Sequence, residues 1–119
     1  MKKKYCFDID GIICTTQKNN YKYSKPNLKI IKIINTLYKK NIIILHTARY
    51  MGRSKDNQKQ ATKRAKTVTL NQLKKWNVKY HKIFFGKPSY DYVIDDKSIL
   101  VNSKLNKKIT SLLKKNLKL

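Results

Sequence analysis

Hydrophobic residues along the chain occur in two spacings, as short continuous runs and as repeats at every third or fourth position. The short runs predict buried strands, which fall at about 4–9, 42–47, 80–85 and 92–95. The repeats predict helices, which fall at about 26–40, 67–76, 97–102 and 104–119. Because strands and helices alternate with short connections, the pattern predicts an α/β fold in which helices cover a mainly parallel sheet.

Two longer polar segments separate these elements. Residues 11–25 are rich in Thr, Asn, Lys and Tyr and predict a loop or a small hairpin. Residues 50–66, which include Gly52, predict a mobile loop with some helix. Pro26 is expected in the first turn of the next helix, because a helix start does not need the backbone N–H that proline lacks.

The length of the chain limits the number of domains. Its 119 residues can bury a core but leave no length for a second folding unit. We therefore expect one domain over residues 1–119, closed by an amphipathic helix at about 104–119 with leucines on one face and lysines on the other.

The charge balance is strongly basic, with 29 Lys and Arg, six Asp and no Glu, for a net charge of +23. Such a charge is typical of proteins that bind nucleic acid or an anionic surface. Lys, Asn and Ile are abundant while arginines number only three, which is also what an AT-rich coding sequence produces. We favour the compositional interpretation, so nucleic acid is a possible partner and not the preferred one.

Other compositional features point to a cytoplasmic protein without a membrane span. Cys6 and Cys14 do not make a disulfide framework, and no Cys/His spacing matches a zinc site. The basic start is not followed by the apolar stretch of a signal peptide. No window approaches the roughly 18 apolar residues that a membrane helix needs.

Five of the six acidic residues fall in two short clusters at the ends of predicted strands, Asp8 with Asp10 and Asp91 with Asp95 and Asp96. Ligands bind beyond the carboxyl ends of the strands in an open α/β sheet. Carboxylates gathered there repel one another unless a positive charge lies between them. Hard oxygen ligands with room for water and phosphate suit Mg²⁺, so the sequence predicts a magnesium site.

Four short segments, in order, resemble the signatures of the haloacid dehalogenase (HAD) superfamily, most closely its small capless phosphatases. They are Asp8-Ile9-Asp10-Gly11, Thr47 within His46-Thr47-Ala48-Arg49, Lys87 within Gly86-Lys87-Pro88, and Asp95-Asp96. The resemblance implies a three-layer α/β/α, Rossmann-like core. The intervals between the signatures leave no room for a cap domain.

The resemblance also implies the catalytic roles. Asp8 would attack phosphorus and form an aspartyl-phosphate that water then hydrolyses. Asp10 would protonate the leaving oxygen and deprotonate the water, while its backbone carbonyl binds Mg²⁺. Asp95 would be a direct metal ligand and Asp96 a supporting or water-mediated one, completing a metal set of Asp8, Asp10, Asp95 and Asp96.

The remaining candidates would bind the phosphoryl group or the substrate: Gly11, Thr47, Ala48, Arg49 and Lys87. Gly11 would turn the backbone so that N–H groups face the phosphate. Thr47 and the Ala48 N–H would donate to its oxygens, and Lys87 would offset its charge. Arg49 is the best candidate for a contact to a phosphate or carboxylate of the substrate.

Each of these residues also has a structural interpretation. Asp8 could cap a turn, and Thr47 could be a hydroxyl that ends a strand. Lys87 could be one solvated lysine among 26, and Arg49 could serve the fold alone. His46 could contact an active-site carboxylate, although a strand-end histidine with a structural partner is the more common case.

The sequence leaves three functions open. The first is a Mg²⁺-dependent phosphomonoester hydrolase that acts on a phosphorylated sugar or sugar acid in surface-polysaccharide biosynthesis. The chain resembles small HAD proteins associated with that pathway, and this resemblance suggests the substrate. The second is a phosphatase of nucleic-acid 3′ ends, and the third is a non-catalytic basic domain that binds nucleic acid. For an enzyme without a cap we also expect a homo-oligomer, because a neighbouring chain could exclude water from the site.

Overall fold

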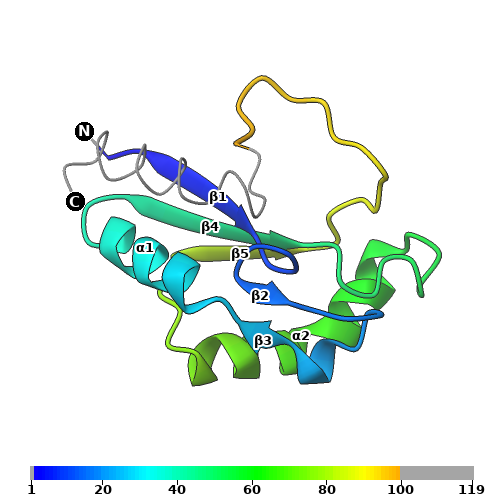
Figure 1. The fold of residues 1–119 in the computed structure, drawn as a ribbon. Helices are drawn as coiled ribbons and strands as arrows, with labels where there is room; N and C mark the ends of the chain where they lie inside the picture. The colour runs from blue at the N-terminus through cyan, green and yellow to red at the C-terminus, as the bar shows by residue number, and fades with distance from the viewer. Residues whose placement is uncertain (1, 100–119) are drawn as a thin grey trace. The chain divides into compact units, whose positions relative to one another are not determined.

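A three-stranded parallel sheet forms the centre of the fold in this computed structural model, which describes residues 2–99. The strands are β1 (Lys4–Asp8), β4 (Ile42–Thr47) and β5 (Lys82–Phe85), in the order β1-β4-β5 (Figure 1). Both strand pairs are parallel, with Asp8 opposite His46 and Thr47 opposite Phe85. The α/β class and the mainly parallel sheet predicted from the sequence are therefore confirmed.

Two helices supply the apolar layer that the sheet needs. They are α1 (Leu28–Tyr38) and α2 (Gln58–Lys75), which contact β4 and β5 respectively and lie on one side of the sheet (Figure 1). Along β4 burial alternates, with Ile43, Leu45 and Thr47 buried. This alternation is expected of a strand whose one face meets the helices.

Both helices begin at an asparagine whose side chain accepts a hydrogen bond from the backbone. Asn27 accepts from Ile30 N at 3.3 Å and Asn57 accepts from Gln60 N at 3.0 Å. The prediction that Pro26 lies in the first helical turn was wrong, because Pro26 belongs to a strand and Asn27 caps the helix instead.

The second helix begins well before the predicted range of 67–76. Its buried residues in the first half are Ala61 and Ala65, which are both small. A helix face made of such residues packs closely but gives little hydrophobic periodicity. For this reason the sequence predicts only some helix within residues 50–66, whereas residues 58–66 are helical throughout.

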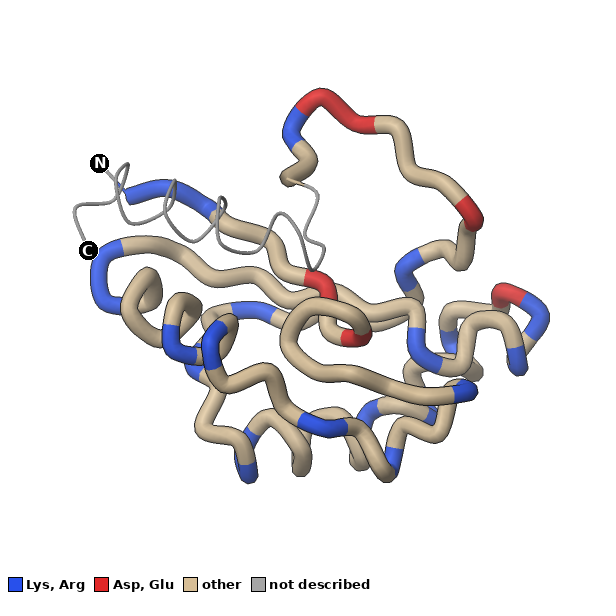
Figure 2. Tube along the Cα trace, viewed as in Figure 1, with Lys and Arg blue, Asp and Glu red and all other residues tan. Residues whose placement is uncertain are grey.

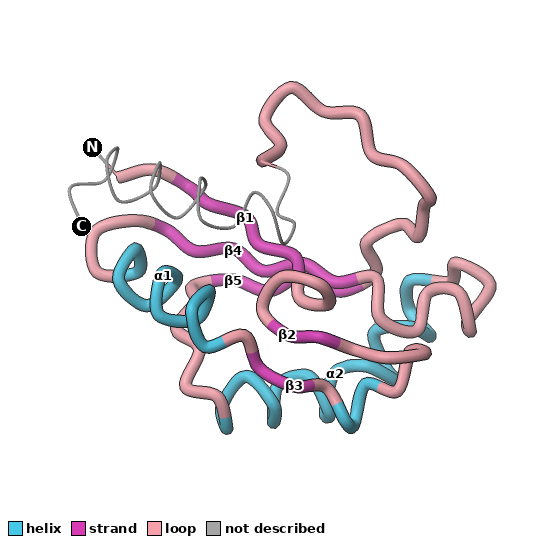
Figure 3. Tube along the Cα trace, viewed as in Figure 1, coloured by secondary structure: helices cyan, strands magenta, loops and turns pink. Residues whose placement is uncertain are grey.

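The polar segment 11–25 forms the small hairpin that the sequence predicted. Its strands β2 (Cys14–Thr15) and β3 (Lys25–Pro26) pair antiparallel, and the short 3₁₀ helix η1 (Tyr21–Tyr23) lies between them. Figure 3 shows this hairpin joined to the end of β1 by a loop. We call residues 11–26 the hairpin segment.

The chain divides into two compact units, Met1–Ser89, which contains every strand and helix above, and Tyr90–Leu119. Within the second unit, the strand predicted at 92–95 is not formed, and Tyr92 and Ile94 are 90% and 99% exposed. The apolar run alone is insufficient, because a strand requires a neighbour to pair its backbone groups. Residues 97–99 are not helical. The rest of the helix predicted near 97–102 and the whole of the 104–119 helix lie outside the described residues.

None of the helices in the part of the chain that the structure describes is both long and apolar enough to cross a membrane.

Candidate active site

Three predicted site residues meet where neighbouring strands end. Asp8 is the last residue of β1, Thr47 is the last residue of β4, and Lys87 follows β5 by two residues. Because β4 lies between the other two strands, parallel pairing brings all three ends to one edge of the sheet. The Lys87 N–H donates to Thr47 O at 3.1 Å, which fixes the segment after β5 beside the end of β4.

Asp8 and Lys87 form an ion pair at this edge. The Lys87 Nζ lies 3.6 Å from Asp8 Oδ2, and the two side chains are 15% and 36% exposed. Asp8 Oδ1 accepts a hydrogen bond from Ile9 N at 3.0 Å. The carboxylate is thus held at one oxygen by the backbone and faces a positive charge at the other, while it stays accessible to a ligand.

The acidic positions of the first unit are unevenly distributed. In Figure 2 two of them stand at the end of β1 and in the loop after it, whereas basic positions are spread over helices, strands and loops. Asp8 and Asp10 are these two residues, and the third, Asp56, is exposed. The negative charge of this unit is therefore concentrated at the strand ends.

Gly11 adopts the backbone conformation predicted for it, but its N–H is directed elsewhere. Its φ of 89° lies in the left-handed region that favours glycine. The Gly11 N–H donates to Cys14 O at 2.8 Å within the hairpin segment. This hydrogen bond closes the turn, and the prediction that N–H groups around Gly11 face a phosphate stays a prediction.

Thr47 and Ala48 lie at the end of β4. Thr47 is 1% exposed, and its Oγ1 accepts a hydrogen bond from Arg49 N at 3.0 Å. This contact shapes the turn that leaves the strand. Their role in binding phosphate oxygens stays a prediction.

Arg49 is directed toward Asp10 and not toward the surface. Its side chain is fully buried, and its Nε donates to Asp10 Oδ2 at 3.0 Å and to Asp10 Oδ1 at 3.2 Å. Its Nη2 donates to Asp10 Oδ1 at 3.0 Å. Arg49 therefore differs from what we expected of a substrate contact, since its guanidinium is occupied within the protein.

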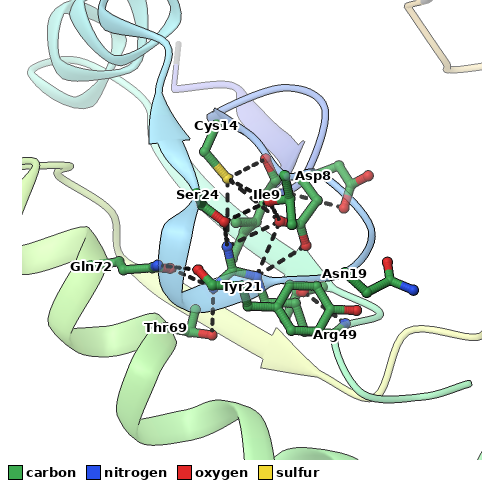
Figure 4. Close-up of polar contacts among 12 residues, drawn as sticks. Asp8, Ile9, Cys14, Asn19, Tyr21, Ser24, Arg49, Thr69 and Gln72 are labelled. Atoms are coloured by element: carbon green, nitrogen blue, oxygen red, sulfur yellow. Dashed lines mark hydrogen bonds and ion pairs between the residues drawn. The ribbon is translucent and has the colours of Figure 1, made fainter. Parts of the chain in front are cut away.

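Several residues around this pair were not singled out from the sequence. The guanidinium also contacts polar groups of the hairpin segment and of α2, namely Cys14, Ser24, Thr69 and Gln72 (Figure 4). Thr16 Oγ1 donates to Asp10 Oδ1 at 2.5 Å. The sequence indicates Thr16 and Ser24 only weakly as site residues, because both carry hydroxyl groups in the segment that follows Asp8 and Asp10. The two α2 residues gave no signal.

His46 lies next to Thr47 on the opposite face of β4. Partial burial is the main cause that lowers its pKa below the usual 6.5, and the nearby Lys87 charge adds to the shift, while Asp8 opposes it. The unfolded chain therefore binds more protons than the folded chain just below pH 6.5. Acidification through this range should cost stability.

We expect the His46→Gln variant to lose less stability than the wild type between pH 7 and pH 5, because glutamine does not titrate. The free energy of unfolding of both proteins, measured in urea at several pH values, tests this. Contributions from the carboxylates are common to both proteins and cancel in the comparison. Parallel stability curves for the two proteins would show that burial of His46 does not affect its protonation.

The acidic residues offer oxygen ligands of the kind that Mg²⁺ prefers, and the magnesium site stays a prediction. Among residues 2–99 no three His, Cys, Asp or Glu side chains gather into a cluster. Asp8 retains an exposed carboxylate edge, whereas both oxygens of Asp10 accept hydrogen bonds from Arg49, so the metal contact predicted for Asp10 is the one through its backbone carbonyl. This set of oxygens suits Mg²⁺.

Asp95 and Asp96 belong to the second unit. Asp95 Oδ1 accepts a hydrogen bond from Lys97 N at 3.0 Å, and this bond is the main cause that lowers the Asp95 pKa below its ordinary value of 3.8. Asp95 is therefore ionised at neutral pH, as a metal ligand must be.

Comparison with known proteins supports the fold. No protein-family model and no curated protein matches the chain. The crystal structure of a target protein from Vibrio cholerae is similar, with a TM-score of 0.77 and 25% sequence identity over 98% of this chain and 99% of that protein. That structure is described without an activity, so the likeness concerns the α/β fold.

Proposed function

We propose that the protein is a capless HAD-type phosphatase that hydrolyses a phosphomonoester with Mg²⁺ through an aspartyl-phosphate. The observation that carries the proposal is the Asp8–Lys87 ion pair at the shared edge of three parallel strands, with Thr47 between them in the sheet. A nucleophilic carboxylate beside a fixed positive charge is the arrangement that phosphoryl transfer requires.

In the first half of the reaction, an Asp8 carboxylate oxygen attacks phosphorus and the bond from phosphorus to the leaving oxygen breaks. The leaving oxygen takes a proton from Asp10. Lys87 offsets the negative charge that the phosphoryl oxygens carry in the transition state. When bound, Mg²⁺ reduces the repulsion between the carboxylates and the substrate.

In the second half, water attacks the phosphorus of the aspartyl-phosphate. Asp10 accepts a proton from this water, and the bond between phosphorus and the Asp8 oxygen breaks to release inorganic phosphate. Both halves need the Asp10 carboxyl in one position, because the leaving group and the water occupy the same side of phosphorus.

We also propose that the sheet belongs to a three-layer α/β/α core, as the resemblance implies, because one of its faces, which carries Cys6, Lys82 and Phe84, is exposed among the described residues. We propose a phosphorylated sugar or sugar acid as the substrate and a homo-oligomer as the assembly.

A screen of phosphate release tests the function. Purified protein would be assayed with sugar phosphates, sugar-acid phosphates, nucleotides and 3′-phosphorylated oligonucleotides, each with Mg²⁺ and with a chelator. We expect Mg²⁺-dependent release with the highest kcat/KM on a sugar or sugar-acid phosphate. A preference for the oligonucleotides would assign the 3′-end activity instead, and release from no substrate would reject the phosphatase.

We expect Asp95→Ala to weaken the response to Mg²⁺ more than Asp96→Ala does. A direct ligand contributes more than a supporting one, and loss of the supporting one already costs roughly 10- to 100-fold in affinity. The Mg²⁺ concentration that gives half-maximal activity, titrated for both variants, measures the difference. A larger shift for Asp96→Ala would exchange the two roles.

A further inference from the structure

Arg49 joins three parts of the first unit through one buried side chain. Two of its donors bind Asp10: Nε donates to Oδ2 at 3.0 Å, and Nη2 donates to Oδ1 at 3.0 Å. Toward α2 its Nη1 donates to Thr69 Oγ1 at 3.1 Å and to Gln72 Oε1 at 2.6 Å. The paired contacts to Asp10 define the plane of the carboxylate as well as its distance.

The hairpin segment supplies the third set of contacts. Arg49 Nη2 donates to Ser24 Oγ at 3.3 Å and to Cys14 Sγ at 3.5 Å, and the guanidinium carbon lies 5.0 Å from the centre of the Tyr21 ring. Gln72, which binds Arg49 through its oxygen, also donates its amide to Tyr21 O. Figure 4 shows these side chains converging on the guanidinium from both elements.

The two oxygens of Asp10 are used unequally. Oδ1 accepts from Thr16 Oγ1 at 2.5 Å, from Arg49 Nη2 and Nε, and from Cys14 Sγ at 3.5 Å, while Oδ2 accepts from Arg49 Nε. Each carboxylate oxygen has two lone pairs. The Asp10 side chain is 28% exposed. Oδ2 is therefore the oxygen left to exchange a proton with a group outside the protein.

We propose that Arg49 is the positioning residue for Asp10, holding Oδ2 toward the reacting group and tying the hairpin segment to α2. The catalytic part of this inference rests on the proposed phosphatase activity, whereas the structural part does not. Arg49 itself touches no substrate, because its side chain is fully buried and its donors are used within the protein.

A double-mutant cycle tests the catalytic part. With a phosphomonoester that the wild type hydrolyses, we expect Arg49→Gln to lower kcat by roughly 10- to 100-fold and to leave KM within about threefold. The loss is smaller than the roughly 100- to 10,000-fold that general acid–base catalysis contributes, because Asp10 itself is still present. In the Asp10→Asn background the same change should lower kcat less than about threefold, because the residue it positions is already inactive. Arg49→Lys keeps the positive charge but lacks the planar guanidinium that contacts both carboxylate oxygens, so it should retain an intermediate kcat.

Two outcomes would overturn the catalytic part. An equal fold-loss of kcat in both backgrounds would mean that Arg49 acts independently of Asp10. A rise in KM with unchanged kcat would make Arg49 a substrate contact. Arg64→Gln, the same substitution at an exposed arginine of α2, controls for loss of charge.

Thiol labelling tests the structural part without any activity. Cys14 is 1% exposed beside the guanidinium, whereas Cys6 is exposed and serves as an internal reference. We expect iodoacetamide to alkylate Cys14 at least about tenfold faster, relative to Cys6, in Arg49→Gln than in the wild type or Arg64→Gln, because the hairpin segment opens more often. The rates would be read by mass spectrometry below the melting temperature of each protein.

Labelling also separates failure of this inference from failure of the proposed function. A Cys14 rate within twofold of the wild type in folded Arg49→Gln overturns the link between the hairpin segment and α2, whatever the activity. If Arg49→Gln does not fold, Arg49→Lys takes its place with the same criteria. Faster Cys14 labelling in a protein that hydrolyses no phosphomonoester would support the link and reject the phosphatase.

Discussion

Asp8→Asn should abolish Mg²⁺-dependent phosphate release while the protein remains folded. We expect a loss of roughly a thousandfold or more in kcat, because an amide cannot form the covalent intermediate and removal of a nucleophile disables the residues that act with it. The fold should survive, since the Asn carbonyl oxygen can still accept the hydrogen bond that Ile9 N donates to Asp8 Oδ1 at 3.0 Å.

Phosphate release and thermal melting of the purified variant, both with Mg²⁺ present, measure this effect. Asp56→Asn is a matched control, because Asp56 is exposed and its φ of 58° is tolerated by asparagine. The control should keep wild-type activity. If the activity of Asp8→Asn stays within threefold of the wild type, Asp8 is not the nucleophile.

Lys87→Met should lower kcat by roughly 100- to 1,000-fold, the usual effect of removing one preorganised group that stabilises developing charge. Methionine retains an unbranched side chain of similar reach but lacks the charge that lies 3.6 Å from Asp8 Oδ2. The loss should appear mainly in kcat, because the charge on the phosphoryl oxygens and Asp8 is redistributed in the transition state.

Steady-state kinetics on the best substrate of the screen would compare this variant with Lys82→Met. Lys82 lies on β5 and is exposed, so its variant tests removal of one positive charge in a very basic protein. Equal losses for the two lysine variants would point to the overall charge of the protein and not to a specific role of Lys87.

The sequence by itself determined the three strands of the sheet and the polar residues at or just after their carboxyl ends. Asp8, Thr47 and Lys87 each follow an apolar run, and parallel strands necessarily present their carboxyl ends at one edge. The prediction of α1 was sound for the same reason, because Ile31, Ile34 and Leu37 repeat at helical spacing and are all buried. These features depend on residues close together in the chain.

Tertiary structure alone decided the features that depend on distant residues. The first half of α2 buries Ala61 and Ala65, whose small side chains become informative only once another element packs against them. The run at 92–95 has the composition of a strand but has no paired strand among the described residues. Arg49 lies two residues after Thr47 in sequence, yet its direction is set by Asp10 and by Thr69 and Gln72 of α2. A buried guanidinium must find several acceptors, and only the folded chain brings them together.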